Sequence, residues 1–160
     1  MHVGISNIIK EVNKLSQTLV SQRAHFECAY IYKRNDKYIL NAHDYKVEVT
    51  VTSPDRVSPV IISFEDLKSA VVSALPNHKF LISNKGGCDN SVDLSLASVF
   101  VTFDRGLYCV IPDYICAETI VSYIASKIDA NLAEYNCLLW QVRLIESADS
   151  YVTWNRASKL

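Results

Sequence analysis

The segment Asn41-Ala-His-Asp-Tyr-Lys-Val-Glu-Val-Thr-Val51 alternates between apolar and polar side chains over its second half. Tyr45 and three valines form the apolar set, and valine is common in strands because its branched side chain suits a pleated surface. A period of two is typical of a strand that buries one face. We therefore predict a half-buried strand here, with His43 at its beginning.

The residues before this segment predict a partner for it. Residues 18–33 alternate in a similar way, with Phe26, Cys28 and Tyr30 in the apolar set. The polar residues 33–37 separate this stretch from residues 38–52. Two alternating stretches joined by a short polar connection indicate a long antiparallel hairpin.

The rest of the chain predicts helices and further strands. An apolar stripe at helical spacing follows Ser63, which is placed to cap the helix it begins. We expect helices at 6–17, 64–75 and 117–132. A short strand is expected to end at 60–62, and further strands are expected at 99–103, 107–111, 138–146 and 151–154. This order predicts an α+β fold, with an antiparallel sheet and two long helices on one face.

Composition limits the class of protein. A chain of 160 residues suits one domain spanning 1–160, and its formal charge of −1 provides no general attraction to nucleic acid or to an anionic membrane. No apolar run reaches the ~20 residues of a membrane span, and the N-terminus lacks the pattern of a secretion signal. Five cysteines without a Cys-x-x-Cys pair suit reduced thiols, so we expect a cytoplasmic protein.

Four regions resemble, in order, the motifs of one enzyme family. Residues 41–45 followed by Val-Glu-Val resemble the His-Gly-His-Asn-Tyr signature and strand of the 6-pyruvoyl tetrahydropterin synthase and 6-carboxy-tetrahydropterin synthase family. The later matches are 61–68 to Met-Asp-Phe-x-Asp-Leu-Lys, 76–81 to Leu-Asp-His-Lys-x-Leu, and 117–118 with 142–147 to Thr-Ala-Glu-Asn and Val-x-Val-x-Glu-Thr. The resemblance runs from about residue 24 to 154.

This resemblance implies a quaternary arrangement as well as a fold. The family has the tunnelling fold, in which the sheets of several subunits join edge to edge into a barrel with active sites between subunits. Closing a barrel removes exposed strand edges. The resemblance therefore implies a homo-oligomer, a trimer or a hexamer, to which the predicted helix within residues 1–17 is an addition.

The zinc site that the family would provide is incomplete in this sequence. The family holds zinc with a first-strand histidine and the two histidines of His-Gly-His, but here the pair reads Asn41-Ala-His43. One register of the first strand makes His25 the remaining ligand, and another puts Tyr30 there. Tight zinc sites need three or four good ligands. His25 and His43 remain the metal candidates, and bound zinc is doubtful.

The proton-transfer residues of the family are changed too. Where the family has a cysteine four residues before its paired histidines, this chain has Lys37, and the family's Asp-His pair reads Asn77-His78. An ammonium group and an amide cannot replace a thiolate base and a carboxylate that orients a histidine. We expect the family's lyase reaction on dihydroneopterin triphosphate to be weak or lost, with His78 the main catalytic candidate beside Asn77 and Lys37.

The residues that would bind the substrate are better kept. Glu146 matches the glutamate with which the family holds the pterin ring, and a carboxylate can accept two parallel N–H groups from such an edge. Glu118 matches the glutamate of Thr-Ala-Glu. The sequence therefore favours a divergent family member with a pterin or purine-like pocket. Two alternatives are a non-catalytic binding or scaffold subunit, and a metal-free enzyme that uses Lys37 or Tyr30 as a base on another heterocycle.

Overall fold

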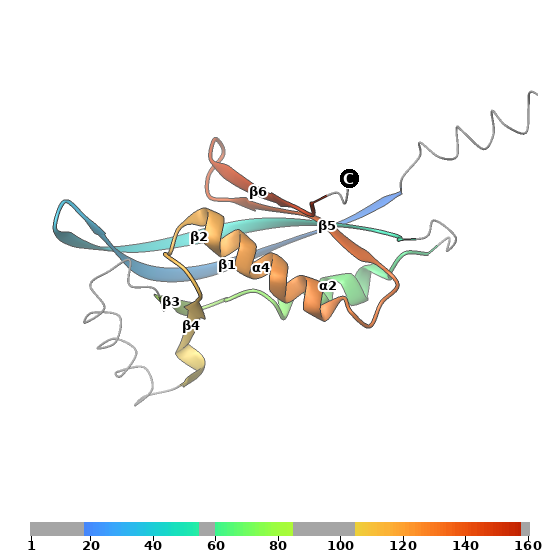
Figure 1. Ribbon diagram of the computed structural model, residues 1–160, viewed down its shortest axis with the longest axis horizontal. Coiled ribbons are helices and arrows are strands. Elements are labelled where there is room, and N and C mark those ends of the chain that lie inside the picture. Colours follow the sequence, from blue (N-terminus) through green and yellow to red (C-terminus); the bar gives the residue numbers. More distant parts are fainter. Residues whose placement is uncertain (1–17, 55–59, 85–104, 158–160) are drawn as a thin grey trace, which may run out of the picture.

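The computed structural model describes residues 18–54, 60–84 and 105–157, and Figure 1 labels their helices and strands. In chain order these are β1 (Leu19–Arg34), β2 (Lys37–Thr52), α2 (Phe64–Val72), β3 (Lys79–Ser83), the 3-10 helix η1 (Arg105–Leu107), β4 (Tyr108–Ile111), α4 (Ala117–Asn131), β5 (Leu138–Ile145) and β6 (Tyr151–Asn155). The helix expected at 6–17 and the strand expected at 99–103 lie outside the described residues. No helix among the described residues is long and apolar enough to cross a membrane.

The predicted hairpin is the centre of the structure. β1 and β2 pair antiparallel along sixteen residues each, and the turn between them contains two residues, Asn35 and Asp36. Both have positive φ, 51° and 57°, as the tightest hairpin turns require. Asparagine and aspartate tolerate this conformation better than most residues. Figure 1 shows the closed end of this hairpin projecting beyond α4.

The sheet has six strands in the order β4-β3-β1-β2-β5-β6. The expected α+β fold is present, but its sheet is mixed and not antiparallel throughout, because β1 and β3 are parallel, as are β3 and β4. The strand β3 was not predicted. Its central Phe-Leu-Ile run is short and does not alternate, which is common for a buried strand beside parallel neighbours.

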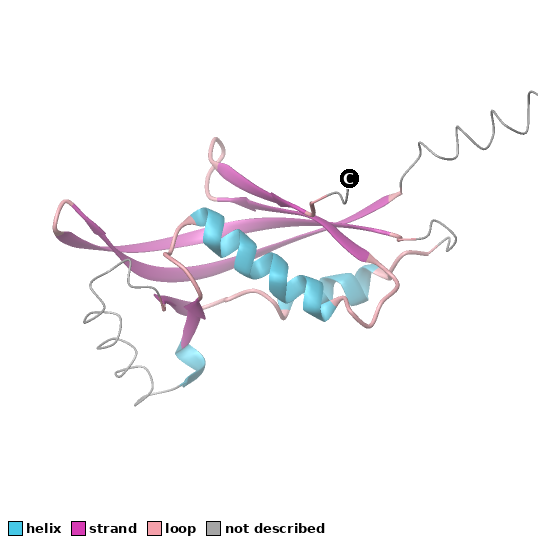
Figure 2. Cartoon of the chain, viewed as in Figure 1, coloured by secondary structure: helices cyan, strands magenta, loops and turns pink. Residues whose placement is uncertain are grey.

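Both helices pack on the same face of this mixed sheet, as Figure 2 also shows. α4 contacts β5 and β6, whereas α2 contacts β1. The core between sheet and helices contains buried side chains from all of these elements, among them Phe26, Tyr45, Val47, Leu67, Ile120, Ile124, Val142 and Leu144. The opposite face of the hairpin carries exposed or partly exposed polar residues, including Arg23, His25, Glu27, Asp44 and Glu48.

The helix boundaries follow local capping. The Ser63 hydroxyl accepts a hydrogen bond from the Asp66 N–H at 3.0 Å, as the sequence predicts for the start of α2. α2 ends at Val72, earlier than expected, because the N–H groups of Ala74 and Leu75 bond to carbonyls three residues back, which tightens the chain into turns. Among the described residues, 60–62 form no strand, and Ile61 and Ile62 pack their side chains into the core.

Candidate functional site

The helix-facing side of the hairpin holds a histidine between aromatic rings. Cross-strand pairing places Tyr30 opposite Asn41, and Phe26 opposite Tyr45. The imidazole of His43 lies between two tyrosines, with ring centroids 6.1 Å from Tyr30 and 5.2 Å from Tyr45. Its side chain is 21% exposed. The ring is therefore fixed by packing on both sides and reaches solvent only at its edge.

A hydrogen bond between two side chains joins the strands beside this histidine. Nδ2 of Asn41 donates to the Tyr30 hydroxyl at 3.1 Å. Burial raises the pKa of Tyr45, and a hydrogen bond with Tyr30 and the charge of Glu146 raise it further. Tyr45 therefore keeps its proton at physiological pH. The two phenols and the amide form a neutral polar group inside an otherwise apolar face.

Cys28 lies directly opposite His43 in the register but offers no thiolate. Its side chain is buried, and burial, followed by the proximity of Cys109, raises the pKa of its thiol from 9.0 to about 12. Metals and electrophiles react with the thiolate form of cysteine. The thiol of Cys28 is therefore a core group and not a catalytic base at neutral pH.

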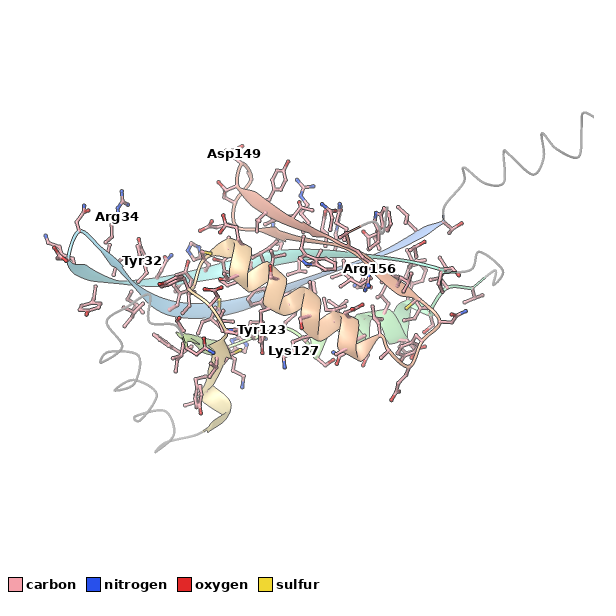
Figure 3. The ribbon with its side chains drawn as sticks, in the orientation of Figure 1. Tyr32, Arg34, Tyr123, Lys127, Asp149 and Arg156 are labelled. Carbon is pink, nitrogen blue, oxygen red and sulfur yellow. The ribbon has the colours of Figure 1, made fainter. Side chains whose placement is uncertain are left out.

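Glu146 completes this site from the end of β5. Oε1 of Glu146 lies 3.1 Å from Nε2 of His43, although the angle misses that of a hydrogen bond, and the buried nitrogen has no other hydrogen-bond partner among the described residues. The Glu146 side chain is 38% exposed. Its backbone N–H donates to the Ser150 carbonyl at 3.0 Å in the β5–β6 turn, where Figure 3 labels Asp149. A partly exposed carboxylate thus borders a buried imidazole.

The structure separates the two histidines that the sequence proposed as metal ligands. His25 pairs with Lys46 and is exposed, whereas Cys28, three residues along the same strand, is buried opposite His43. Because successive side chains of a strand alternate between its faces, His25 and His43 point to opposite sides of the sheet. Tyr30, in contrast, shares a face with His43 and Asn41. Of the two registers that the sequence leaves open, only the one with Tyr30 puts a first-strand residue beside His43.

The side chains at this position do not fit a zinc ion. They comprise the His43 imidazole, the Glu146 carboxylate beside it, an amide whose nitrogen is used as a donor, a phenol and a buried thiol. Within the described residues, no group of three or more histidine, cysteine, aspartate or glutamate side chains could hold a metal ion. Three imidazoles or their equivalent would be needed for a catalytic zinc.

A pocket lies where the hairpin meets the residues around β3. Its cavity of about 570 Å³ is lined by Glu27 and Asp44 of the exposed face, by Cys28 and His43, and by His78, Lys79, Phe80 and Leu107. Nδ1 of His78 lies 3.7 Å from Oε2 of Glu27, and their side chains are 74% and 63% exposed. Sequence reasoning missed Glu27, because this contact joins positions far apart in the chain. Its place in the polar set of β1 was the available signal.

Asn77 has a structural position beside this pocket. Its Oδ1 accepts a hydrogen bond from the Glu27 N–H at 3.0 Å, and the His78 N–H donates to the Glu27 carbonyl at 2.7 Å. His78 has a φ of 54°, which turns the chain into β3. The Asn77 oxygen therefore attaches this turn to β1 and is not free to orient the His78 imidazole.

The other two candidates lie at the ends of their elements. Lys37 pairs with Arg34 at the closed end of the hairpin, where Figure 3 labels Arg34. Six residues of strand separate Lys37 from His43, which corresponds to about 20 Å. Glu118 is exposed in the first turn of α4, and hydrogen bonds from its own backbone N–H and from the Cys116 side chain lower its pKa. These bonds give Glu118 a capping role at the helix N-terminus.

Comparisons with known proteins give the family. The model of the 6-pyruvoyl tetrahydropterin synthase family matches residues 19–157. No curated protein sequence matches the chain.

Solved structures give the same fold. The 6-pyruvoyl tetrahydropterin synthase of Plasmodium falciparum is 17% identical, with a TM-score of 0.64 over 88% of this chain and 98% of its own. A Plasmodium vivax synthase in which a catalytic glutamate is replaced by alanine is 16% identical, with a TM-score of 0.62 over 87% and 98%. The Caenorhabditis elegans synthase is 12% identical, with a TM-score of 0.55 over 89% and 97%. With its tunnelling fold and this match over most of its length, the chain belongs to the 6-pyruvoyl tetrahydropterin synthase family.

Proposed function

We propose that this chain binds a planar nitrogen heterocycle of the pterin or purine type through Glu146 and His43. The observation that carries the proposal is the partly exposed Glu146 carboxylate, 3.1 Å from a buried imidazole nitrogen that has no hydrogen-bond partner among the described residues. A buried polar atom without a partner is costly, so a ligand that supplies one is stabilised there. The carboxylate can at the same time accept two N–H groups from the edge of a heterocycle.

The surroundings of the pair suit a flat ligand. Tyr30 and Tyr45 fix the imidazole on both sides, so His43 presents its edge in one orientation. Binding sites that are ordered before the ligand arrives lose less entropy on binding. The related structures are named as tetrahydropterin synthases, which supports a pterin as the first ligand to test.

We further propose that the lyase reaction of the family is weak or lost. Lys37 lies about 20 Å along β2 from His43, and Asn77 holds the Glu27 backbone. The thiol of Cys28 stays protonated at neutral pH because burial raises its pKa to about 12. None of these three groups can therefore act as the general base of the reaction beside His43 and Glu146.

Binding is tested by titrating pterin and guanine into the protein and following fluorescence quenching. Replacing Glu146 by Gln removes the charge, and we expect pterin affinity to fall about 10- to 100-fold, the range for a charge-assisted hydrogen bond. Glu134→Gln, on the exposed turn after α4, is the matched control. Equal affinity of Glu146→Gln and wild-type protein would exclude Glu146 as the anchor.

A second candidate function is metal-free proton transfer on the other face of the sheet. The contact between His78 and Glu27 at the 570 Å³ pocket favours it, and the Plasmodium vivax relative also has a catalytic glutamate. Turnover of dihydroneopterin triphosphate in the presence of chelator, lost in His78→Ala, would support this candidate. No turnover by wild-type protein would reject it for this substrate.

We also propose a homo-oligomer, a trimer or a hexamer. β4 and β6 form the two edges of the described sheet and carry exposed apolar side chains, Val110 and Tyr151. The edge strands of a sheet are usually covered, and joining edges between subunits would cover both. Sedimentation equilibrium of the full chain tests this proposal, which a stable monomer at micromolar concentration would contradict.

A further inference from the structure

The place where a metal would lie beside His43 is taken by a hydrogen bond between two neutral side chains. Tyr30 and Asn41 face each other across β1 and β2, and Nδ2 of Asn41 donates to the Tyr30 hydroxyl. We infer that this tyrosine–asparagine pair replaces a metal ion as the group that joins the two strands and holds His43, so that the site is ordered without zinc. The inference that zinc is absent depends only on which side chains could bind a metal. What it means for ligand binding rests on the proposed function.

The chemistry of the side chains opposes metal binding here. An amide nitrogen that donates a hydrogen bond has no lone pair for a cation, and the Tyr30 hydroxyl already accepts that bond. The Cys28 thiol opposite His43 is buried in the core. The His43 imidazole and the Glu146 carboxylate are left, and two ligands are too few for a tight zinc site.

The packing around His43 supplies the order that a metal would otherwise provide. Tyr30 is 7% exposed and Tyr45 is 1% exposed, and both rings lie against the imidazole. A metal ligand normally has its ring orientation fixed by the metal and by a second hydrogen bond. In this chain, aromatic packing fixes the orientation, with Nε2 beside the Glu146 carboxylate.

The same geometry predicts that a metal site can be restored. Residues 30, 41 and 43 share one face of the hairpin, with 30 directly opposite 41 and the Tyr30 ring centroid 6.1 Å from that of His43. Replacing both Tyr30 and Asn41 by histidine would place three imidazoles around one point. Three nitrogen ligands and one open position are the usual arrangement of a catalytic zinc.

The experiment compares three proteins for cobalt and zinc binding: wild type, Tyr30→His/Asn41→His, and that double variant with His43→Ala added. Untagged proteins purified without chelator are measured for zinc per chain and for the visible absorption of bound Co²⁺. We expect near zero zinc for wild type, about one per chain with tetrahedral Co²⁺ absorption for the double variant, and loss of both in the triple variant. About one zinc per wild-type chain would overturn the inference.

A second measurement covers the case in which the double variant does not fold. The imidazole ¹⁵N signals of His43 are recorded in wild type with and without chelator, and in Tyr30→Phe. We expect no change on chelation and a clear shift in Tyr30→Phe, with Tyr114→Phe, an exposed tyrosine, as the matched control. A shift of the His43 signals on adding chelator would contradict the inference that the site is ordered without zinc. Unchanged signals in Tyr30→Phe would contradict the inference that the tyrosine–asparagine pair holds His43. Neither result depends on pterin binding, so this inference and the proposed function can fail separately.

Discussion

The two faces of the β1–β2 hairpin hold their polar residues in different ways. On the helix-facing side, Tyr30, Asn41 and His43 are fixed by ring contacts and a hydrogen bond inside the core. On the other side, Glu27 and His78 meet at 3.7 Å with both side chains largely in solvent. Packing makes the first arrangement specific, whereas solvent screens the second. The comparison teaches that burial decides how firmly a polar side chain of this hairpin is held.

Removing a buried aromatic ring from the helix-facing side should cause the largest loss of stability. Tyr45→Ala deletes an aromatic side chain that is 1% exposed and contacts both Phe26 and His43. We expect the free energy of unfolding in urea to fall by about 3–5 kcal/mol, as for other buried aromatic residues. Lys46→Ala, the next residue and exposed on the opposite face, should change it by less than about 0.5 kcal/mol. Similar losses in the two variants would contradict the assignment of the faces.

The hydrogen bond on the buried face gives the next largest effect. Tyr30→Phe keeps the ring but leaves the Asn41 donor unpaired, so we expect a loss of about 1–3 kcal/mol in the free energy of unfolding. A double-mutant cycle with Asn41→Leu measures the pair directly by urea unfolding. The double variant should be more stable than the sum of the two single losses predicts, because no buried donor is then left alone. Simple additivity would mean that the hydrogen bond contributes little.

High pH should weaken the buried face selectively. Burial raises the pKa of the Cys28 thiol from 9.0 in the unfolded chain to about 12 in the fold. Between these values the folded chain retains a proton that the unfolded chain releases, so stability falls as pH rises from about 9 to about 12. Cys28→Ala should reduce this slope in unfolding measurements. Tyr45 and Tyr123 also have raised pKa values, so a remaining slope is expected, but an unchanged slope would contradict the burial of the thiol.

The exposed pair should give the smallest effect. Glu27→Gln removes the charge beside His78 but keeps the backbone contacts of residue 27 with Asn77 and His78. We expect the free energy of unfolding to change by less than about 0.5 kcal/mol, as for most exposed ion pairs. Asn77→Ala should cost more, because the Glu27 N–H then loses its acceptor. A larger loss of stability in Glu27→Gln than in Asn77→Ala would show that the Glu27 charge, and not the backbone hydrogen bond, stabilises this contact.

Sequence patterns predicted the long elements and missed the contacts between distant ones. The strands of the hairpin came out within a residue of their observed ends, since their alternation extends over many residues. His25 was a metal candidate from the sequence, and only the strand pairing puts it on the face away from His43. In contrast, β3 has too few residues to show a period, and its parallel pairing with β1 depends on a distant part of the chain.

The candidate site shows the same limit. The family motif identified Glu146 and His43 separately, and their 3.1 Å contact required the pairing of β2 with β5. The contact between Glu27 and His78 likewise depends on how the turn before β3 meets β1. A motif assigns residues to roles in a relative, but only the register shows which side chains share a face.

The central claim is a heterocycle site at Glu146 and His43 that works without metal. Its most direct test is a pterin titration of chelator-treated protein, repeated after addition of one equivalent of zinc. We predict saturable binding with the same dissociation constant in both titrations and a loss of affinity in Glu146→Gln. Binding that appears only after zinc is added would contradict this account.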